Sequence, residues 1–91
     1  MIDGMPPSPP PARLVVPDLG MSGVPIAVSL WLVPAGAAVA AGDRVVELLC
    51  GAATIDLESP VSGRLLRHLV DEDDLVAPGA VLAEFTPADP E

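Results

Sequence analysis

A chain of 91 residues with a net charge of −9 is one small domain, and it lacks the clustered Lys and Arg that a nucleic-acid-binding face requires. Its four basic residues are all arginines, so no lysine is present to form a Schiff base or an amide with a cofactor. A single cysteine excludes an internal disulfide and leaves the redox compartment open, and we expect a cytoplasmic protein.

The first twelve residues are rich in proline, which neither donates to a sheet nor continues a helix. We expect residues 1–12 to be a disordered or polyproline-like arm, residues 13–86 to form the domain, and residues 87–91 to be a frayed tail.

Six short apolar runs, separated by Gly, Pro and Asp, follow the arm, and none keeps a helical period for more than two turns. This pattern predicts an all-β fold, either a flattened β-sandwich or a barrel. The expected strands are Leu14–Val16, Ile26–Val33, Arg44–Leu49, Ala53–Leu57, Arg64–Val70 and Val81–Phe85.

The uncharged stretch from Leu19 to Gly42 is long enough to cross a bilayer. It contains Pro25, Pro34 and several glycines that would interrupt a helix, and the residues that flank it directly are Asp18 and Asp43. The N-terminus also lacks the basic start and apolar run of a secretory signal. We therefore expect neither a membrane span nor a membrane partner.

An internal repeat at an offset of 37 residues relates Val39-Ala40-Ala41-Gly42 to Val76-Ala77-Pro78-Gly79. Asp73 falls at the position of Gly36, and Asp tolerates tight turns better than most residues. Neither half can bury an apolar face alone, so the repeat predicts two halves related by a quasi-twofold axis. A hairpin turning at Cys50-Gly51-Ala52 would then project from one end, with both termini at the other.

Several segments between Leu14 and Thr86 carry a family resemblance through their order and spacing. The segments are Val16-Pro17-Asp18-Leu19-Gly20-Met21, Trp31, Ile55-Asp56-Leu57-Glu58-Ser59-Pro60-Val61-Ser62-Gly63, and the block from Val70 to Glu84. They resemble the biotinyl/lipoyl attachment domain family, above all the lipoyl domains of 2-oxo acid dehydrogenase acyltransferases. The resemblance implies the flattened β-sandwich of those domains, often called a hammerhead.

The sequence departs from that family at the tip of the predicted hairpin. The resemblance places Ala52 where the family carries its lipoyl- or biotinyl-lysine, within the hairpin residues Cys50, Gly51, Ala52 and Ala53. An alanine methyl forms no amide, and no lysine exists to take its place in another register. We therefore expect no cofactor, neither lipoate nor biotin.

The remaining reactive side chains favour no catalysis and no metal site. Cys50 has acidic neighbours, which are the wrong sign of charge to stabilise a thiolate. His68 has no second ligand at metal-binding spacing, and the run Asp71–Asp74 lacks the pattern of a calcium loop. Trp31 is expected to be a half-buried core aromatic. The sequence predicts that the chain is not an enzyme.

The resemblance implies a protein-binding surface. We expect this surface to be the face formed by Glu47, Gly51, Ala52, Asp56 and Glu58. The first hypothesis is an unmodified binding or assembly module of a 2-oxo acid dehydrogenase-type, acyl-transfer or carboxylase system. Its partners would be dehydrogenase, acyltransferase or carboxylase subunits. Two alternatives stay open: a swinging-arm carrier attached through Cys50, and a decayed carrier domain without a partner.

Overall fold

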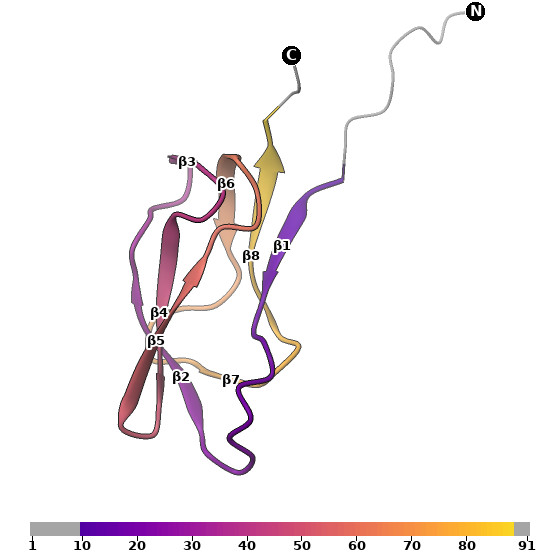
Figure 1. Ribbon diagram of the computed structural model, residues 1–91. Helices are drawn as coiled ribbons and strands as arrows, with labels where there is room; N and C mark the ends of the chain where they lie inside the picture. Colours follow the sequence, from indigo (N-terminus) through magenta and orange to yellow (C-terminus); the bar gives the residue numbers. More distant parts are fainter. Residues whose placement is uncertain (1–9, 89–91) are drawn as a thin grey trace, which may run out of the picture.

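The protein, described over residues 10–88 by a computed structural model, is built from eight β-strands joined by turns (Figure 1). The strands are β1 (Ala12–Val15), β2 (Ile26–Trp31), β3 (Ala38–Val39), β4 (Arg44–Cys50), β5 (Ala53–Glu58), β6 (Gly63–His68), β7 (Leu75–Val76) and β8 (Val81–Pro87). They form two antiparallel sheets, in the orders β1-β8-β6-β3 and β5-β4-β2-β7. The predicted all-β sandwich is confirmed. Residues 1–9 of the expected arm and residues 89–91 of the expected tail lie outside the described residues.

All six expected strands are present, although their ends differ from the prediction by one or two residues. The two-residue strands β3 and β7 were not predicted, because two residues are too few to show the alternation that marks a strand. Within the described residues, the structure contains no helix long and apolar enough to cross a membrane.

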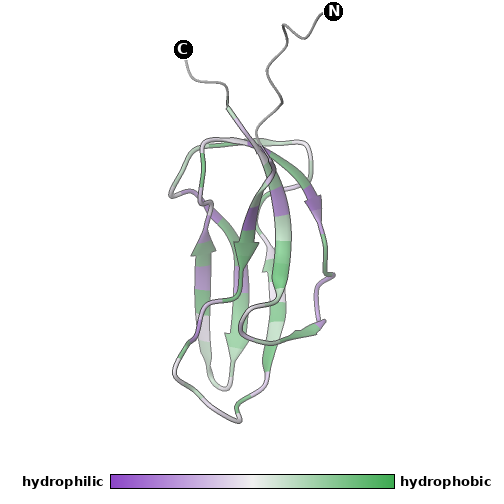
Figure 2. Cartoon of the chain, turned by 90° about the vertical axis from the view of Figure 1, so that its right-hand side faces the viewer, coloured by the Kyte–Doolittle hydropathy of each residue, from purple (hydrophilic) through white to green (hydrophobic). Residues whose placement is uncertain are grey.

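The core lies between the two sheets and consists almost entirely of aliphatic side chains. Buried positions recur at every second residue over parts of the strands, as at Val46, Leu48 and Cys50 of β4. Figure 2 shows apolar stretches on the strands of both sheets. Phe85 in β8 is the largest fully buried side chain. Its smaller neighbours in the core include Val28, Leu48, Leu65 and Leu82, which are also fully buried.

The predicted quasi-twofold repeat is confirmed by the backbone. Strands β2, β3 and β4 begin at residues 26, 38 and 44, and their counterparts β6, β7 and β8 begin at 63, 75 and 81. Gly36 and Asp73 both have positive φ, of 93° and 76°, and Asp73 is the one described non-glycine residue that does. Their amides donate to equivalent carbonyls, Leu65 O and Val28 O, both at 2.7 Å. The tip of the β4–β5 hairpin lies at the end of the molecule opposite the start of β1 and the end of β8 (Figure 1).

The segment from Ser59 to Gly63 leads from β5 into β6, and two of its residues have structural roles. Ser59 is buried, and its hydroxyl donates a hydrogen bond of 2.6 Å to the carbonyl of Val61. Gly63 lies so close to β8 that a side-chain Cβ would contact the Thr86 carbonyl and approach Pro87 Cα to 2.9 Å. The close approach of β6 and β8, which are paired in the same sheet, therefore requires glycine at this position.

Candidate functional site

The candidate site is the tip of the β4–β5 hairpin. Cys50 and Ala53 face each other across the last pair of the two strands, so that Gly51 and Ala52 alone form the turn. Gly51 has a φ of 63° and Ala52 a negative φ, the signs of a type II′ turn with glycine at its first central position. Both residues are exposed. The methyl group of Ala52 thus lies in solvent at one end of the molecule.

The sequence placed Cys50 in the turn, but in the structure Cys50 is the last residue of β4. Its side chain is fully buried, and its Sγ lies 3.6 Å from Met21 Sδ. Inward-pointing positions alternate along β4, and residue 50 follows the buried Leu48 by two residues. The thiol therefore packs as a small apolar group and is not presented to a substrate.

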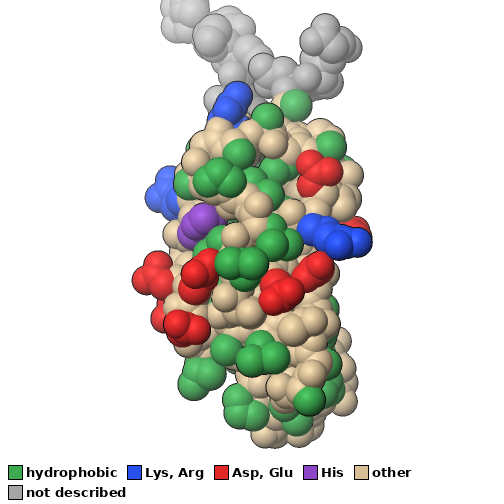
Figure 3. Space-filling view, turned by 90° about the vertical axis from the view of Figure 1, so that its left-hand side faces the viewer, with side chains coloured by type: hydrophobic (Ala, Val, Ile, Leu, Met, Phe, Trp, Pro, Cys, Tyr) green, Lys and Arg blue, Asp and Glu red, His purple; other side chains and the backbone are tan. Residues whose placement is uncertain are grey.

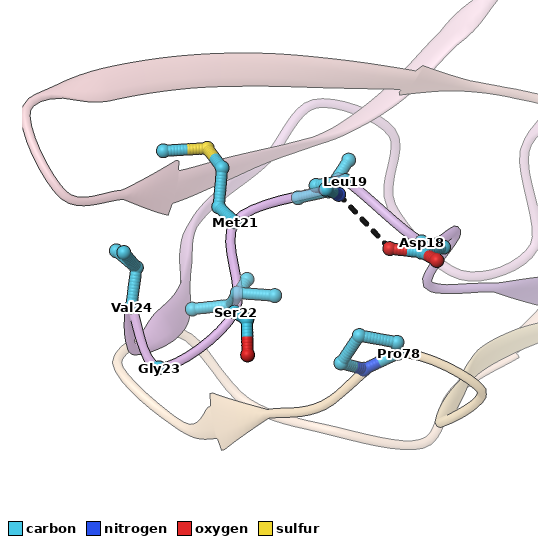
Figure 4. Close-up of a pocket in the computed structure, with 9 residues that line it drawn as sticks. Asp18, Leu19, Met21, Ser22, Gly23, Val24 and Pro78 are labelled. Atoms are coloured by element: carbon cyan, nitrogen blue, oxygen red, sulfur yellow. Dashed lines mark hydrogen bonds between the residues drawn. The ribbon is translucent and has the colours of Figure 1, made fainter.

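The loop from Asp18 to Val24 supports the tip, a role that the sequence analysis did not identify. Met21 contacts Cys50, and a Cβ at Gly51 would come within 3.4 Å of Val24 Cγ1. Asp18 accepts a hydrogen bond of 2.9 Å from the Gly20 amide, which holds the start of the loop (Figure 4). The sequence signal for this loop is the Pro17-to-Met21 segment that carries part of the resemblance.

An open cavity of about 580 Å³ lies beside this loop, between it and the turn before β8. Figure 4 shows Met21 pointing toward the neighbouring hairpin, and Ser22 and Pro78 lining the cavity. Asp18 is the charged residue of its lining. No cluster of catalytic groups surrounds this cavity within the described chain, since the other lining residues are apolar, glycine or serine.

The predicted acidic face is assembled on the hairpin strands. Glu47 of β4 lies directly opposite Asp56 of β5, and residues opposite each other project from the same side of a sheet. Glu58 follows Asp56 by two residues and lies opposite Arg44. Arg44 Nη1 is 3.7 Å from Asp56 Oδ2, and both groups are solvent-accessible. The structure thus brings three carboxylates to one face of the hairpin that ends at Ala52.

Trp31 and His68 form a stacked pair, with ring centroids 3.8 Å apart and an angle of 12° between the planes. Trp31 is half-buried, as predicted, and its Nε1 donates to the Val70 carbonyl at 3.1 Å. His68 Nε2 lies 2.9 Å from the Val33 carbonyl. The two residues occupy equivalent positions of the repeat, because β2 ends at Trp31 and β6 at His68. Their interactions tie the two halves together.

The acidic turn after β6 also has structural contacts. Asp74 accepts a hydrogen bond from the Asp71 amide at 2.8 Å, and Glu72 accepts one from the Trp31 amide at 3.0 Å. Across residues 10–88, no three His, Cys, Asp or Glu side chains come together as a metal-binding group.

Comparisons with known proteins agree with this geometry. A family model described as "Biotin-requiring enzyme" matches residues 12–85. The chain is 33% identical over 70 residues to the dihydrolipoyllysine-residue acetyltransferase component of the pyruvate dehydrogenase complex of Corynebacterium glutamicum. It is 37% identical over 67 residues to the dihydrolipoyllysine-residue succinyltransferase component of the 2-oxoglutarate dehydrogenase complex of Bartonella vinsonii subsp. berkhoffii.

The matched regions are small parts of those relatives. They cover 77% and 74% of this chain, but 10% and 16% of the acetyltransferase and succinyltransferase components. Among solved structures, a single-chain, multi-domain long-chain acyl-CoA carboxylase contains a region that superposes with a TM-score of 0.72 at 24% identity. That match covers 96% of this chain and 8% of the carboxylase, and it concerns the fold alone.

Proposed function

The chain belongs to the biotinyl/lipoyl domain family, and we propose that it serves this family's systems as a docking module that carries no cofactor. Ala52 occupies the hairpin position to which the resemblance assigns the attachment lysine, and the 91 residues contain no lysine. The observation that supports the proposal most strongly is the exposed methyl of Ala52 at the hairpin tip, where a carrier would present an amine.

The relatives give the class of partner that we propose. Two of them are components of 2-oxo acid dehydrogenase complexes, and the structural neighbour is an acyl-CoA carboxylase. We propose that the hairpin tip and its acidic face, formed by Glu47, Asp56 and Glu58, contact a dehydrogenase, acyltransferase or carboxylase subunit. A cytoplasmic location, without membrane or nucleic-acid partners, fits this role and is part of the proposal.

The structure weighs against a carrier attached through Cys50. The thiol is fully buried between the sheets and packs against Met21, so acylation would require the end of β4 to open. A swinging arm needs its attachment atom in solvent. Ala52 meets that geometric need but not the chemical one, and Cys50 meets the chemical need but not the geometric one.

Binding to purified subunits tests this function. We expect the chain to bind at least one dehydrogenase, acyltransferase or carboxylase subunit saturably, measured by isothermal titration calorimetry. The variant Ala52→Asp is expected to weaken that binding about tenfold, because it places a desolvated charge at the contact.

The control variant is Ala38→Asp, which puts the same charge on an exposed alanine of β3 in the other sheet. This variant should bind like the unaltered chain. Failure to bind any of these subunits, or equal binding by both variants, would contradict the proposed function.

A further inference from the structure

The quasi-twofold repeat allows each residue on the outer face of one sheet to be compared with its counterpart on the other. Strand order makes β4 equivalent to β8, β2 to β6, and β5 to β1. The backbones of the two halves match, including a bulge in β2 between Val28 and Leu30 and one in β6 between Leu65 and Arg67. Differences between the outer faces therefore arise from the side chains.

On the β1-β8-β6-β3 sheet, one carboxylate lies between two arginines. Glu84 of β8 is opposite Arg13 on one side and Arg67 on the other. Its carboxylate oxygens lie 3.7 Å from Arg13 Nε and 3.2 Å from Arg67 Nε. The charge of Glu84 is thus compensated within the sheet.

On the β5-β4-β2-β7 sheet, the equivalent carboxylate lacks this compensation. Glu47 is opposite Asp56 in β5 and Leu30 in β2, which take the places of Arg13 and Arg67. Arg44 approaches Asp56, but among the residues that the structure describes no basic side chain forms an ion pair with Glu47. Like charges directly opposite each other destabilise a sheet, so this arrangement is unfavourable in the isolated chain.

Exposed leucines lie beside Glu47 on this face. Leu49 of β4 is opposite Ala27 of β2, which is opposite Leu75 of β7, so these three residues form a row across the sheet. Leu49 is 42% exposed, Leu75 is 75% exposed, and Leu30 in the next row is 46% exposed. The space-filling view shows hydrophobic side chains between groups of carboxylates on this side of the molecule (Figure 3).

We propose that the outer face of the β5-β4-β2-β7 sheet binds a partner protein through an arginine or lysine flanked by apolar side chains. The cation would take the place beside Glu47 and Asp56 that Arg13 and Arg67 take beside Glu84. The flanking apolar groups would cover Leu30, Leu49 and Leu75. This inference rests on the proposed function for the existence of a protein partner, and it adds the surface and its chemistry.

Charge complementarity selects this partner over a second copy of the chain. Each copy carries a net charge of −9, so two copies repel each other. Arg13 and Arg67, two of the four basic residues, are already engaged by Glu84. The outer face of the β5-β4-β2-β7 sheet is acidic, exposes leucines and has a position for a cation beside Glu47. It therefore fits a basic, partly apolar surface of another protein.

Two substitutions, each of which introduces the residue found at the equivalent position of the other sheet, test whether Glu47 lacks charge compensation. Leu30→Arg gives Glu47 the neighbour that Glu84 has, and we expect it to raise the thermal unfolding midpoint by about 3 °C. The matched control, Arg67→Leu, gives Glu84 the neighbour that Glu47 has and should lower the midpoint by a similar amount. A lower midpoint for Leu30→Arg would overturn the argument that Glu47 is uncompensated.

Binding is read by NMR on the ¹⁵N-labelled chain, with the peptide acetyl-Arg-Leu-Arg-Leu-amide as the probe. We expect saturable shifts of the Leu30, Glu47, Leu49 and Asp56 amides, and an affinity at least tenfold lower for Leu30→Arg but unchanged for Arg67→Leu. The peptide acetyl-Glu-Leu-Glu-Leu-amide should produce no such shifts. Absent shifts, shifts centred on Arg67 and Glu84, or dimerisation in sedimentation analysis would each overturn the proposal.

These results separate the inference from the proposed function. Peptide binding at this face, together with no binding to any dehydrogenase, acyltransferase or carboxylase subunit, would support the surface and reject the assigned systems. Subunit binding that Ala52→Asp weakens and Leu30→Arg leaves unchanged would support the function and overturn the surface.

Discussion

The substitution Ala52→Lys is expected to make the chain a substrate for lipoate ligase, and we expect one lipoyl group per chain where the unaltered chain accepts none. Ala52 is exposed at the second position of a two-residue turn, so a lysine there would extend into solvent from the end of the hairpin. The fold is that of the family, and if Ala52 holds the attachment position, as we propose, this change supplies the amine that the ligase modifies. Intact-mass spectrometry after incubation with ligase, ATP and lipoate measures it, with biotin ligase and biotin assayed in parallel.

Ala53→Lys is the matched control, because it moves the same amine by one residue into the first position of β5. It should be modified much more slowly than Ala52→Lys. A folded Ala52→Lys variant that both ligases leave unmodified would show that Ala52 does not occupy the attachment position. Preferential modification of Ala53→Lys would show that the register is shifted by one residue.

The substitution Gly63→Ala is expected to lower the free energy of unfolding by about 3 kcal/mol, because the added methyl would overlap the backbone of β8. The Cβ would overlap the Thr86 carbonyl oxygen and lie 2.9 Å from Pro87 Cα. Both are backbone atoms, which cannot rotate away as a side chain would. A domain of this size has roughly 5 to 15 kcal/mol of stability, so the loss is large. Urea unfolding followed by Trp31 fluorescence measures it.

The control for Gly63→Ala is Gly79→Ala. Gly79 has a φ of 92° but nothing within 4 Å of its Cβ position, so this change introduces only backbone strain of about 1 kcal/mol. Equal losses for the two variants would mean that strand β8 moves to accommodate the methyl, and that close packing is not what requires glycine at residue 63.

Much of the fold was predictable because each half of the internal repeat gives the same prediction of strands and turns. The match of Gly42 with Gly79, and of Gly36 with Asp73, predicted turns that the structure forms with positive φ at all four residues. The sandwich followed because two similar halves with apolar faces can bury them against each other. The short strands β3 and β7 escaped prediction, since their pairing with β6 and β2 depends on how distant segments meet.

The hairpin was predicted more accurately than the environment of its residues. The glycine and small residues at 51 and 52 indicated a tight turn, but the burial of Cys50 depends on Met21 and on the facing sheet, both remote in sequence. The sequence also did not reveal that Glu84 lies between two arginines whereas Glu47, within the described part of the chain, has none beside it. This difference depends on bulges that bring Leu30 and Arg67 opposite those carboxylates, and a bulge shifts the register by one residue.

The chain has the fold of its family, and we propose that its hairpin tip carries no attachment amine. The acidic face of β4 and β5, the buried Cys50 and the exposed Ala52 all lie within one hairpin, and none of them supplies an amine or an accessible thiol. These features are the basis on which we propose a binding role for the hairpin.

The most direct measurement of this account is the mass of the hairpin peptide in the protein purified from its native host. Cleavage after Arg44 and Arg64 releases residues 45–64, which include Cys50, Ala52 and the whole turn. We predict that this peptide has the mass of its unmodified sequence. An added lipoyl, biotinyl or acyl group on it would show that the domain is a carrier and would contradict the account.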